Sequence, residues 1–404
     1  MYPTLYHAFL DLFGMEVGFL KLFNSFGFFV VIAFLTGAYI LKLEIDRKTQ
    51  EGVIPVLIKK VKRGEKPSLM SFVSNSLLGA LLGFKFLYLV LDSGDALANP
   101  PAFLLSFTGS WFGAIIGAAL FYWLRAQEVK KEAKEFPKEV EVEYTVTSKE
   151  HASNIAMTAA LWGFLGAKLF FIVEDPDHII SFFTEFSVDS ILSGLTVFGG
   201  LILGGGMVLY YFKKHGIPVF AGADAAALAY ILSYGVGRIG CQVSGDGDWG
   251  IANKFPKPDW LSWAPDWIWA YDYPNNVNGV QGFSEKGGYI GKIISPDMNY
   301  PIFDGYGTYL DPAVYPTPIY ELFMASAIFF LLWMVRKRIK AFGVIFFLVL
   351  FFNGIERFFI EKIRVNEELT LFGIEATQAE FIAFSLILAG LIGAIWRWRK
   401  NQVA

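Results

Sequence analysis

Cysteine is almost absent from this 404-residue chain, which holds one, Cys241. A single cysteine excludes an intrachain disulfide and a cysteine-based zinc site, and we expect no metal. Charged residues are also scarce, at 18% of the chain, whereas hydrophobic residues make up 54%. Soluble domains of this length do not have this composition, so we expect an all-α polytopic membrane protein.

Long apolar runs recur along the chain and predict about nine transmembrane helices, because about 20 apolar residues cross the hydrocarbon core of a bilayer. The runs lie near 24–43, 71–91, 105–124, 154–173, 190–212, 219–240, 317–335, 341–360 and 377–396. No lysine or arginine precedes Lys21, so the N-terminus does not have the pattern of a cleaved signal peptide.

The connections between these runs differ in their lysine and arginine content. Segments 92–104 and 174–189 contain neither residue. The basic connections are 42–66, 125–150, 213–214, 336–338 and 397–400. By the positive-inside rule the basic connections are cytoplasmic, which predicts the N-terminus outside and the C-terminus inside.

This pattern divides the chain into six segments. They are an N-terminal interfacial segment (1–23), first transmembrane helices (24–125), a charged cytoplasmic linker (126–153), core helices (154–240), an irregular extracytoplasmic head (241–316) and C-terminal core helices (317–404). The head is rich in Trp, Asp, Asn, Gly and Pro, which suits a cap that lies on the membrane interface.

One helix pair is repeated within the chain. Leu82–Tyr88 matches Leu165–Phe171, and Asp92 matches Asp175. Further on, Trp111–Ile116 parallels Val197–Ile202. We therefore expect a duplicated helix pair within 24–125, with low-complexity membrane sequence as the alternative explanation.

Two arginines stand near the ends of apolar runs, Arg238 after 220–232 and Arg357 within 342–359. An arginine in hydrocarbon keeps its charge and costs about 3 kcal/mol on insertion scales, so it needs an anionic partner or a watery cavity. Both are expected at the outer headgroup level, where lipid phosphate is the commonest anion. Snorkelling of Arg238 to the interface is the alternative.

The segment around Arg238 reads GRIGCQVSGDGDWG over 237–250. Its glycines permit turns whose amides can cradle a phosphate, and the arginine fork fits phosphate oxygens. A second motif consists of polar residues spaced at i, i+4, i+8 and i+11, which places them on one face of a helix. Its members are Asn353, Arg357, Glu361 and Arg364. A salt-bridged helix end would show the same spacing.

Three further segments carry candidate residues. Tyr320 and Glu321 follow the prolines that open the run at 317. Gly199 and Gly200 begin a small-residue run, which favours close helix packing or a lipid groove. Asp224 is a carboxylate inside the run that bears Arg238, as a buried structural partner or a site residue.

Together these segments resemble the prolipoprotein diacylglyceryl transferase family. Its signature reads Gly-Arg-Ile-Gly-Asn-Phe-Ile-Asn-Gly-Glu-x-Trp-Gly, and residues 237–250 look like it with one residue inserted. The family's Gly-Gly-Leu-Ile-Gly, Ala-Asp, Pro-Ser-x-Leu-Tyr-Glu and Arg-x-x-x-Glu-x-x-Arg segments have counterparts in the same order. These are 199–202, Asp224, 316–321 and Arg357, Glu361 and Arg364. The resemblance covers roughly 155–396. It does not extend to the duplicated pair or to the enlarged head.

The resemblance implies transfer of a diacylglyceryl group from phosphatidylglycerol to the lipobox cysteine of prolipoproteins, the first step of bacterial lipoprotein modification. It implies a multi-pass protein of the bacterial cytoplasmic (inner) membrane, with its active site facing the outer leaflet and no cofactor. The expected partners are phosphatidylglycerol, the prolipoprotein signal-peptide lipobox and the lipid bilayer. No nucleic acid is expected, and a monomer suffices.

On this hypothesis Arg238 and Arg357 stabilise the phosphate as its charge develops. Glu361 orients Arg357, and Arg364 supports the headgroup. The remaining candidate substrate-binding residues are Gly199, Gly200, Asp224, Cys241, Ser244, Gly250, Tyr320, Glu321 and Asn353.

The chain departs from the family pattern at several positions. The histidine that precedes Gly-Gly in many members is Phe198 here, and an N-terminal Tyr-Gly appears as Phe26-Gly27. The signature's two asparagines and its glutamate are replaced by Cys241, Ser244 and Asp246.

The proton acceptor is therefore open, with Asp246 as the first candidate, Glu321 as the second and His178 as the third. A covalent role for Cys241 is an alternative within the enzyme hypothesis. The competing class is a non-enzymatic lipid or organic-anion membrane transporter that uses the same arginines for binding.

Overall fold

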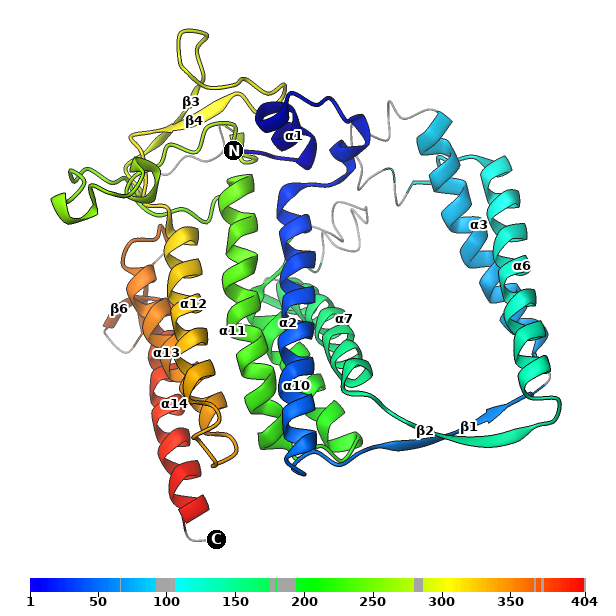
Figure 1. The fold of residues 1–404 in the computed structure, drawn as a ribbon. Coiled ribbons are helices and arrows are strands. Elements are labelled where there is room, and N and C mark those ends of the chain that lie inside the picture. Colours follow the sequence, from blue (N-terminus) through cyan, green and yellow to red (C-terminus); the bar gives the residue numbers. More distant parts are fainter. Residues whose placement is uncertain are drawn as a thin grey trace. The chain divides into compact units, whose positions relative to one another are not determined.

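The computed structural model describes residues 1–65, 67–91, 103, 106–174, 179, 194–279, 286–366, 368–371 and 374–402 (Figure 1). The chain forms two compact units. The first comprises 1–55, 148–160 and 206–404, and the second comprises 56–147 and 161–205.

Helices dominate the described residues. They are α1 (Leu5–Phe13), α2 (Ser25–Gln50), α3 (Leu69–Leu91), α6 (Trp111–Glu135), α7 (Ser148–Glu174), α10 (Val197–Lys214), α11 (Val219–Ser244), α12 (Thr317–Val335), α13 (Val344–Glu361) and α14 (Gln378–Gln402). Three short 3-10 helices are η1 (Gly18–Leu22), η2 (Asp259–Leu261) and η3 (Asp266–Ile268).

Each of the nine apolar runs overlaps one of the helices from α2 to α14 in the described part of the chain. Of these, six are long and apolar enough to cross a membrane, namely α2, α3, α7, α11, α12 and α14. The protein is thus a polytopic, mostly helical membrane protein. Residues 190–193, where a run was expected to begin, lie outside the described residues.

Within the described ranges, three antiparallel two-stranded sheets accompany the helices. They are β1 (Ile58–Arg63) with β2 (Val140–Thr145), β3 (Ile290–Ile293) with β4 (Thr308–Asp311), and β5 (Glu368–Leu371) with β6 (Ile374–Thr377). The β3–β4 sheet gives order to a head that we expected to be irregular. Strands of four residues are too short to show a period of two in the sequence.

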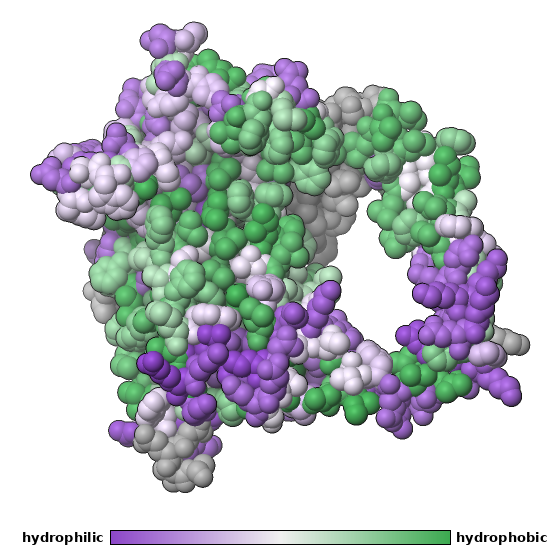
Figure 2. All heavy atoms as spheres, viewed as in Figure 1, coloured by the Kyte–Doolittle hydropathy of each residue, from purple (hydrophilic) through white to green (hydrophobic). Residues whose placement is uncertain are grey.

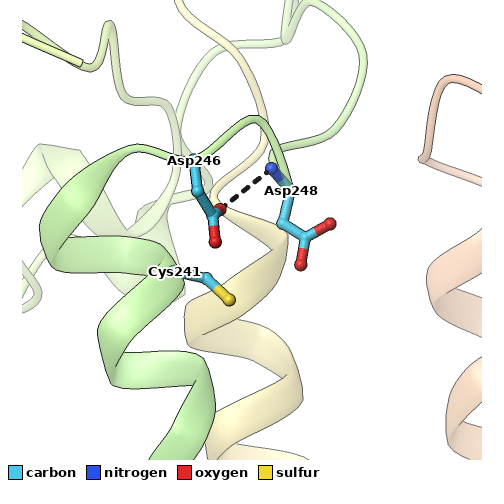
Figure 3. A group of neighbouring side chains, drawn as sticks. All are labelled: Cys241, Asp246 and Asp248. Atoms are coloured by element: carbon cyan, nitrogen blue, oxygen red, sulfur yellow. Dashed lines mark hydrogen bonds between the residues drawn. The ribbon is translucent and has the colours of Figure 1, made fainter. Parts of the chain in front are cut away.

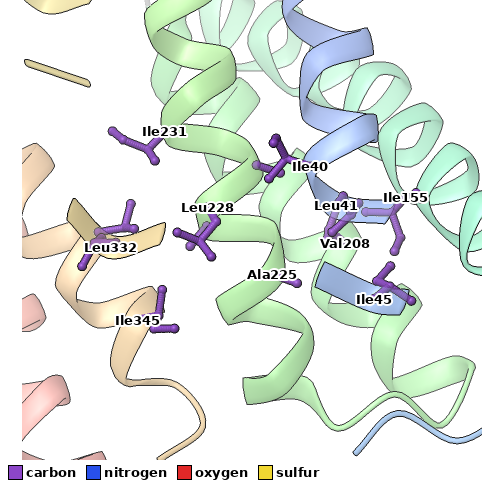
Figure 4. Close-up of a cluster of buried hydrophobic side chains, with 14 of the residues drawn as sticks. Ile40, Leu41, Ile45, Ile155, Val208, Ala225, Leu228, Ile231, Leu332 and Ile345 are labelled. Atoms are coloured by element: carbon purple, nitrogen blue, oxygen red, sulfur yellow. The ribbon is translucent and has the colours of Figure 1, made fainter. Parts of the chain in front are cut away.

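The core of the first unit surrounds α11, which packs against α2, α12 and α13, while α14 packs against α13. Small residues in 221–229 let the neighbouring helices approach α11 closely. Buried aliphatic side chains from six helices meet in one cluster (Figure 4). Figure 2 shows apolar side chains covering these helices, with hydrophilic ones gathered toward their ends.

In the second unit, α3 and α6 cross with their backbones in contact. A Cβ at Gly83 would lie 2.1 Å from the carbonyl oxygen of Gly113, so neither position tolerates a side chain. The returning chain donates the Ser110 N–H to the Phe84 carbonyl at 2.8 Å. Lys85, inside the apolar run, is satisfied by backbone carbonyls, including that of Phe103 at 2.6 Å.

The ends of α7 and α10 repeat these contacts. A Cβ at Gly166 would lie 2.4 Å from the carbonyl oxygen of Gly199, and the Thr196 N–H donates to the Ala167 carbonyl at 3.1 Å. The residues involved occupy matching places in the two copies of the sequence repeat. The duplication itself stays a prediction. Gly200 lies beside this crossing, where a Cβ would stand 3.1 Å from the Gly163 carbonyl oxygen.

Candidate active site

The polar motif at 237–250 covers the last turns of α11 and the turn that follows. The helix ends at Ser244, whose hydroxyl donates to the Gly240 carbonyl at 2.8 Å, and Gly245 then takes a left-handed φ of 66°. A Cβ at Gly240 would lie 3.1 Å from the Phe26 carbonyl oxygen, so glycine allows the close approach of α2. At the other end of the motif, Gly250 pairs with Arg364 in a β-bridge.

Arg238 lies between two carboxylates that come from different parts of the chain. It forms an ion pair with Asp248, and its Nε lies 3.0 Å from Oε2 of Glu321. The guanidinium also stands over the ring of Tyr234, 5.1 Å from its centroid. The anionic partner that an arginine in an apolar run requires is therefore supplied twice.

Asp248 holds Arg238 and Arg364 together. Its Oδ1 lies 2.5 Å from Nη2 of Arg364, while its other oxygen faces Arg238. Burial acts to raise the pKa of the Asp248 carboxyl, but the two guanidinium groups outweigh it, and the pKa lies well below its ordinary value. Asp248 was not among our predicted site residues. The motif is one residue longer than the family signature, and this insertion was the signal that the acidic position could be shifted along the chain.

The ion pairs link five side chains into one group, called the cluster below: Arg238, Asp248, Glu321, Arg357 and Arg364. Glu321 lies at the centre of the cluster, and its side chain is 0% exposed. Its Oε1 lies 3.6 Å from Nη1 of Arg357 and accepts a hydrogen bond from the Tyr234 hydroxyl at 2.7 Å. With its other oxygen facing Arg238, this one carboxylate fixes both predicted phosphate-binding arginines.

A second buried carboxylate, Glu356, adjoins this network. Its Oε2 accepts a hydrogen bond from Asn353 Nδ2 at 2.7 Å, and its Oε1 lies 3.2 Å from the Tyr234 hydroxyl. The Tyr234 hydroxyl has one proton, so it donates to only one of the two carboxylates at a time. We had singled out neither Glu356 nor Tyr234, although a glutamate within an apolar run is itself a signal of a site.

Glu361 lies one turn after Arg357, and its Oε2 is 2.9 Å from Arg357 Nη2. The other oxygen accepts hydrogen bonds from Asn366 and, at 2.8 Å, from the Thr377 hydroxyl. Contacts on both sides fix the direction in which Glu361 presents its charge to Arg357.

Cys241, Asp246 and Asp248 meet where α11 ends, with one sulfur or oxygen atom from each within 4.8 Å of the others (Figure 3). Asp246 accepts a hydrogen bond from the Asp248 N–H at 3.3 Å. Burial and the charge of Asp248 raise the pKa of the Asp246 carboxyl. Both oxygens of Asp248 are committed to arginines, so this group does not fit a divalent metal ion.

Several predicted residues are not brought to this cluster. Asp224 lies fourteen positions before Arg238 on α11, about 21 Å along the helix. Its carboxylate accepts the N–H groups of Gly343 and Phe346, both at 2.9 Å, and so caps the start of α13. Tyr320 contacts the head through the Trp269 carbonyl at 3.4 Å.

Gly199 and Gly200 belong to the second unit, where they form the crossing of α7 and α10. His178, the third candidate for the proton acceptor, lies outside the described residues.

Comparison with known proteins gives this cluster a family context. A family model described as "Prolipoprotein diacylglyceryl transferase" matches residues 132–396, which is more than half of the chain. The chain belongs to this family. Every residue of the cluster lies inside the region that matches the prolipoprotein diacylglyceryl transferase family.

Individual relatives carry the same description. A phosphatidylglycerol–prolipoprotein diacylglyceryl transferase from Corynebacterium glutamicum is 27% identical over 251 residues, covering 61% of this chain and 69% of the relative. One from Clostridium tetani is 26% identical over 63% of this chain and 84% of the relative. One from Staphylococcus carnosus is 26% identical over 77% of this chain and 94% of the relative.

Proposed function

We propose that this protein is an enzyme that transfers the diacylglyceryl group from phosphatidylglycerol to the lipobox cysteine of prolipoproteins. The observation that carries the proposal is the linked set of three arginines and two carboxylates. Arg238 and Arg357 share Glu321, while Arg238 and Arg364 share Asp248, within the region that matches the family. Such a set offers several fixed donors to one phosphate group.

We further propose that all nine helices from α2 to α14 cross the bacterial cytoplasmic membrane, with the N-terminus outside and the C-terminus inside. The basic connections support this orientation. Arg238 and Arg357 then face the outer leaflet, where both the lipid and the translocated signal peptide are within reach. A monomer contains the whole cluster and suffices for the reaction, which involves no nucleic acid.

In the proposed reaction, the thiolate sulfur of the lipobox cysteine attacks the glyceryl carbon that bears the phosphate. The carbon–oxygen bond breaks, a carbon–sulfur bond forms, and glycerol phosphate leaves with the bonding electrons. Negative charge grows on the phosphate as the bond breaks. Arg238 and Arg357 stabilise this charge more strongly in the transition state than in the bound lipid, which lowers the barrier.

The proton of the thiol needs an acceptor, and Asp246 remains our first candidate. Its raised pKa makes it a better base than an ordinary aspartate. Glu321 is the second candidate, but its two oxygens already face the guanidinium groups of Arg238 and Arg357. A free thiol has a pKa of about 8.5, so part of it is already ionised near neutral pH.

The test is incubation of the purified protein with phosphatidylglycerol and a lipobox peptide, followed by mass spectrometry for a thioether-linked diacylglyceryl adduct. We expect the adduct in the wild type, its loss in Arg238→Ala, and continued product formation in Cys241→Ala. An adduct that requires Cys241 would indicate a covalent enzyme intermediate. Absence of adduct, together with lipid binding that is indifferent to the lipobox thiol, would favour the transporter.

A further inference from the structure

Residues 253–269 of the head form a loop that displays large aromatic side chains. Trp260 is 72% exposed, Trp263 79%, Phe255 70% and Trp267 41%. By contrast, Trp249 of the same head is buried in its small core. We call residues 253–269 the aromatic loop.

The aromatic loop is folded, so the exposure of its rings is part of its structure. Its two ends are joined by a hydrogen bond from Asn253 Nδ2 to the Trp269 carbonyl at 2.7 Å, and the Trp269 indole donates to the Phe255 carbonyl at 2.9 Å. Across the middle, Lys257 forms an ion pair with Asp266 at 3.0 Å. Leu261 is buried.

A short pattern is used twice to place the tryptophans. Pro258-Asp259-Trp260 opens η2, and Pro265-Asp266-Trp267 opens η3. In both cases the proline caps a 3-10 turn, and the tryptophan that follows the aspartate projects to the surface. Each copy of the turn therefore places one tryptophan directly after an aspartate in the sequence.

The base of the aromatic loop lies at the end of the helix bundle. On either side of the loop, Ala252 and Tyr271 both pair with Val314, only three residues before α12 begins at Thr317. α12 is one of the helices able to cross a membrane. In Figure 1 the loop, in light green, projects sideways from this end of α12.

From this placement we propose that the aromatic loop is an interfacial anchor, whose exposed tryptophans and Phe255 enter the headgroup layer of the bilayer beside the cluster around Arg238. Tryptophan joins a large apolar surface to a polar N–H and therefore favours the membrane–water interface over either phase. The adjacent Asp259, Asp266 and Lys257 suit the same layer, whereas a protein-binding core is depleted in such charges.

The test places a probe on the loop. Ser262 is exposed between Trp260 and Trp263, and Asp297 is exposed in a polar turn of the same head. Each is changed to cysteine in the full-length protein and labelled with an environment-sensitive fluorophore; the unsubstituted protein, whose Cys241 is buried, gives the background. The labelled proteins enter nanodiscs of phosphatidylcholine and phosphatidylglycerol, with and without lipid that carries a quencher near its headgroup.

We expect the Ser262→Cys probe to be quenched at least about twofold more than the Asp297→Cys probe, because an interfacial segment lies about 5–10 Å into the headgroup boundary. Replacing Trp260 and Trp263 by serine should remove this difference while leaving the unfolding temperature close to that of the parent. Equal quenching of the two probes would overturn the proposal. So would a Ser262→Cys probe that ignores the quencher lipid but responds to a lipobox peptide, since the loop would then bind peptide. None of these readouts depends on transferase activity.

Discussion

Replacing Arg238 by lysine tests whether the shape of the cation matters as well as its charge. The guanidinium of Arg238 reaches Asp248 through Nη1 and Glu321 through Nε, the latter at 3.0 Å. A lysine ammonium is a single point donor and cannot present two such edges at once. The variant therefore keeps the positive charge but loses the oriented fork, which we propose acts on the leaving phosphate.

The expected loss follows from what one fixed donor contributes to a developing anion. Removing such a donor lowers turnover by about 10²–10³, or about 2.7–4 kcal/mol of transition-state stabilisation. We therefore expect Arg238→Lys to form the lipid–peptide adduct about 10²–10³ times more slowly at saturating phosphatidylglycerol. The assay is the initial rate by mass spectrometry, together with thermal unfolding in the same detergent.

Arg63→Lys is the matched control, because Arg63 forms a half-exposed ion pair with Glu132 at 3.5 Å. Such surface pairs contribute about 0–1 kcal/mol, so this variant should stay within about twofold of the wild-type rate. An Arg238→Lys enzyme that retains at least a third of the wild-type rate would refute the argument for the fork, whatever its stability.

Three further predictions concern the proton acceptor, the repeated helix crossing and the α13 cap. Burial and a neighbouring carboxylate raise the pKa of Asp246, so the transfer rate should fall as the pH drops through that pKa and the carboxylate is protonated. Asp246→Asn should remove this acidic limb of the pH–rate profile and lower the rate about 10²–10⁴-fold. Gly166→Ala places a Cβ 2.4 Å from a backbone oxygen and should lower the free energy of unfolding, measured by thermal unfolding, by about 1–3 kcal/mol. At Gly163 the nearest atom would lie 3.8 Å from an added Cβ, so Gly163→Ala should be neutral or stabilising. Asp224→Asn removes the charge from a buried cap that also faces a lysine at 3.8 Å, and it should lower the free energy of unfolding by about 3–5 kcal/mol. Asp46→Asn, at a partly exposed ion pair, should cost less than about 1 kcal/mol, and equal losses would contradict the capping role.

The helices were predictable because a bilayer demands long apolar runs, and hydropathy records them residue by residue. The arginines were predictable for the opposite reason, since Arg238 and Arg357 break that rule. Their partners were harder to find. Tyr234 and Glu321 lie 87 positions apart in sequence and meet only because α11 packs against α12. No local pattern contains that information.

Other differences have local causes. The inserted residue in the signature made Asp246 the apparent counterpart of the family glutamate, whereas the ion pairs fall on Asp248, two positions later. The sheet in the head rests on strands of four residues, below the length at which alternation is visible. Asp224 could be recognised as a buried carboxylate, but not as a cap, because α13 starts more than a hundred positions further on.

The pairing of β1 with β2 has a consequence for how the segment between them is connected to the rest of the chain. Ile58 lies opposite Thr145, and the Val146 N–H donates to the Leu57 carbonyl at 2.8 Å, so the segment that carries α3 and α6 begins and ends at one place. Those two helices bury their glycine faces against each other. The segment from Leu57 to Val146 therefore starts and finishes at adjacent backbone positions, as a hairpin loop does. A helix pair with joined ends can enter or leave a membrane protein as a cassette, since the flanking helices need no new spacing on either side of it.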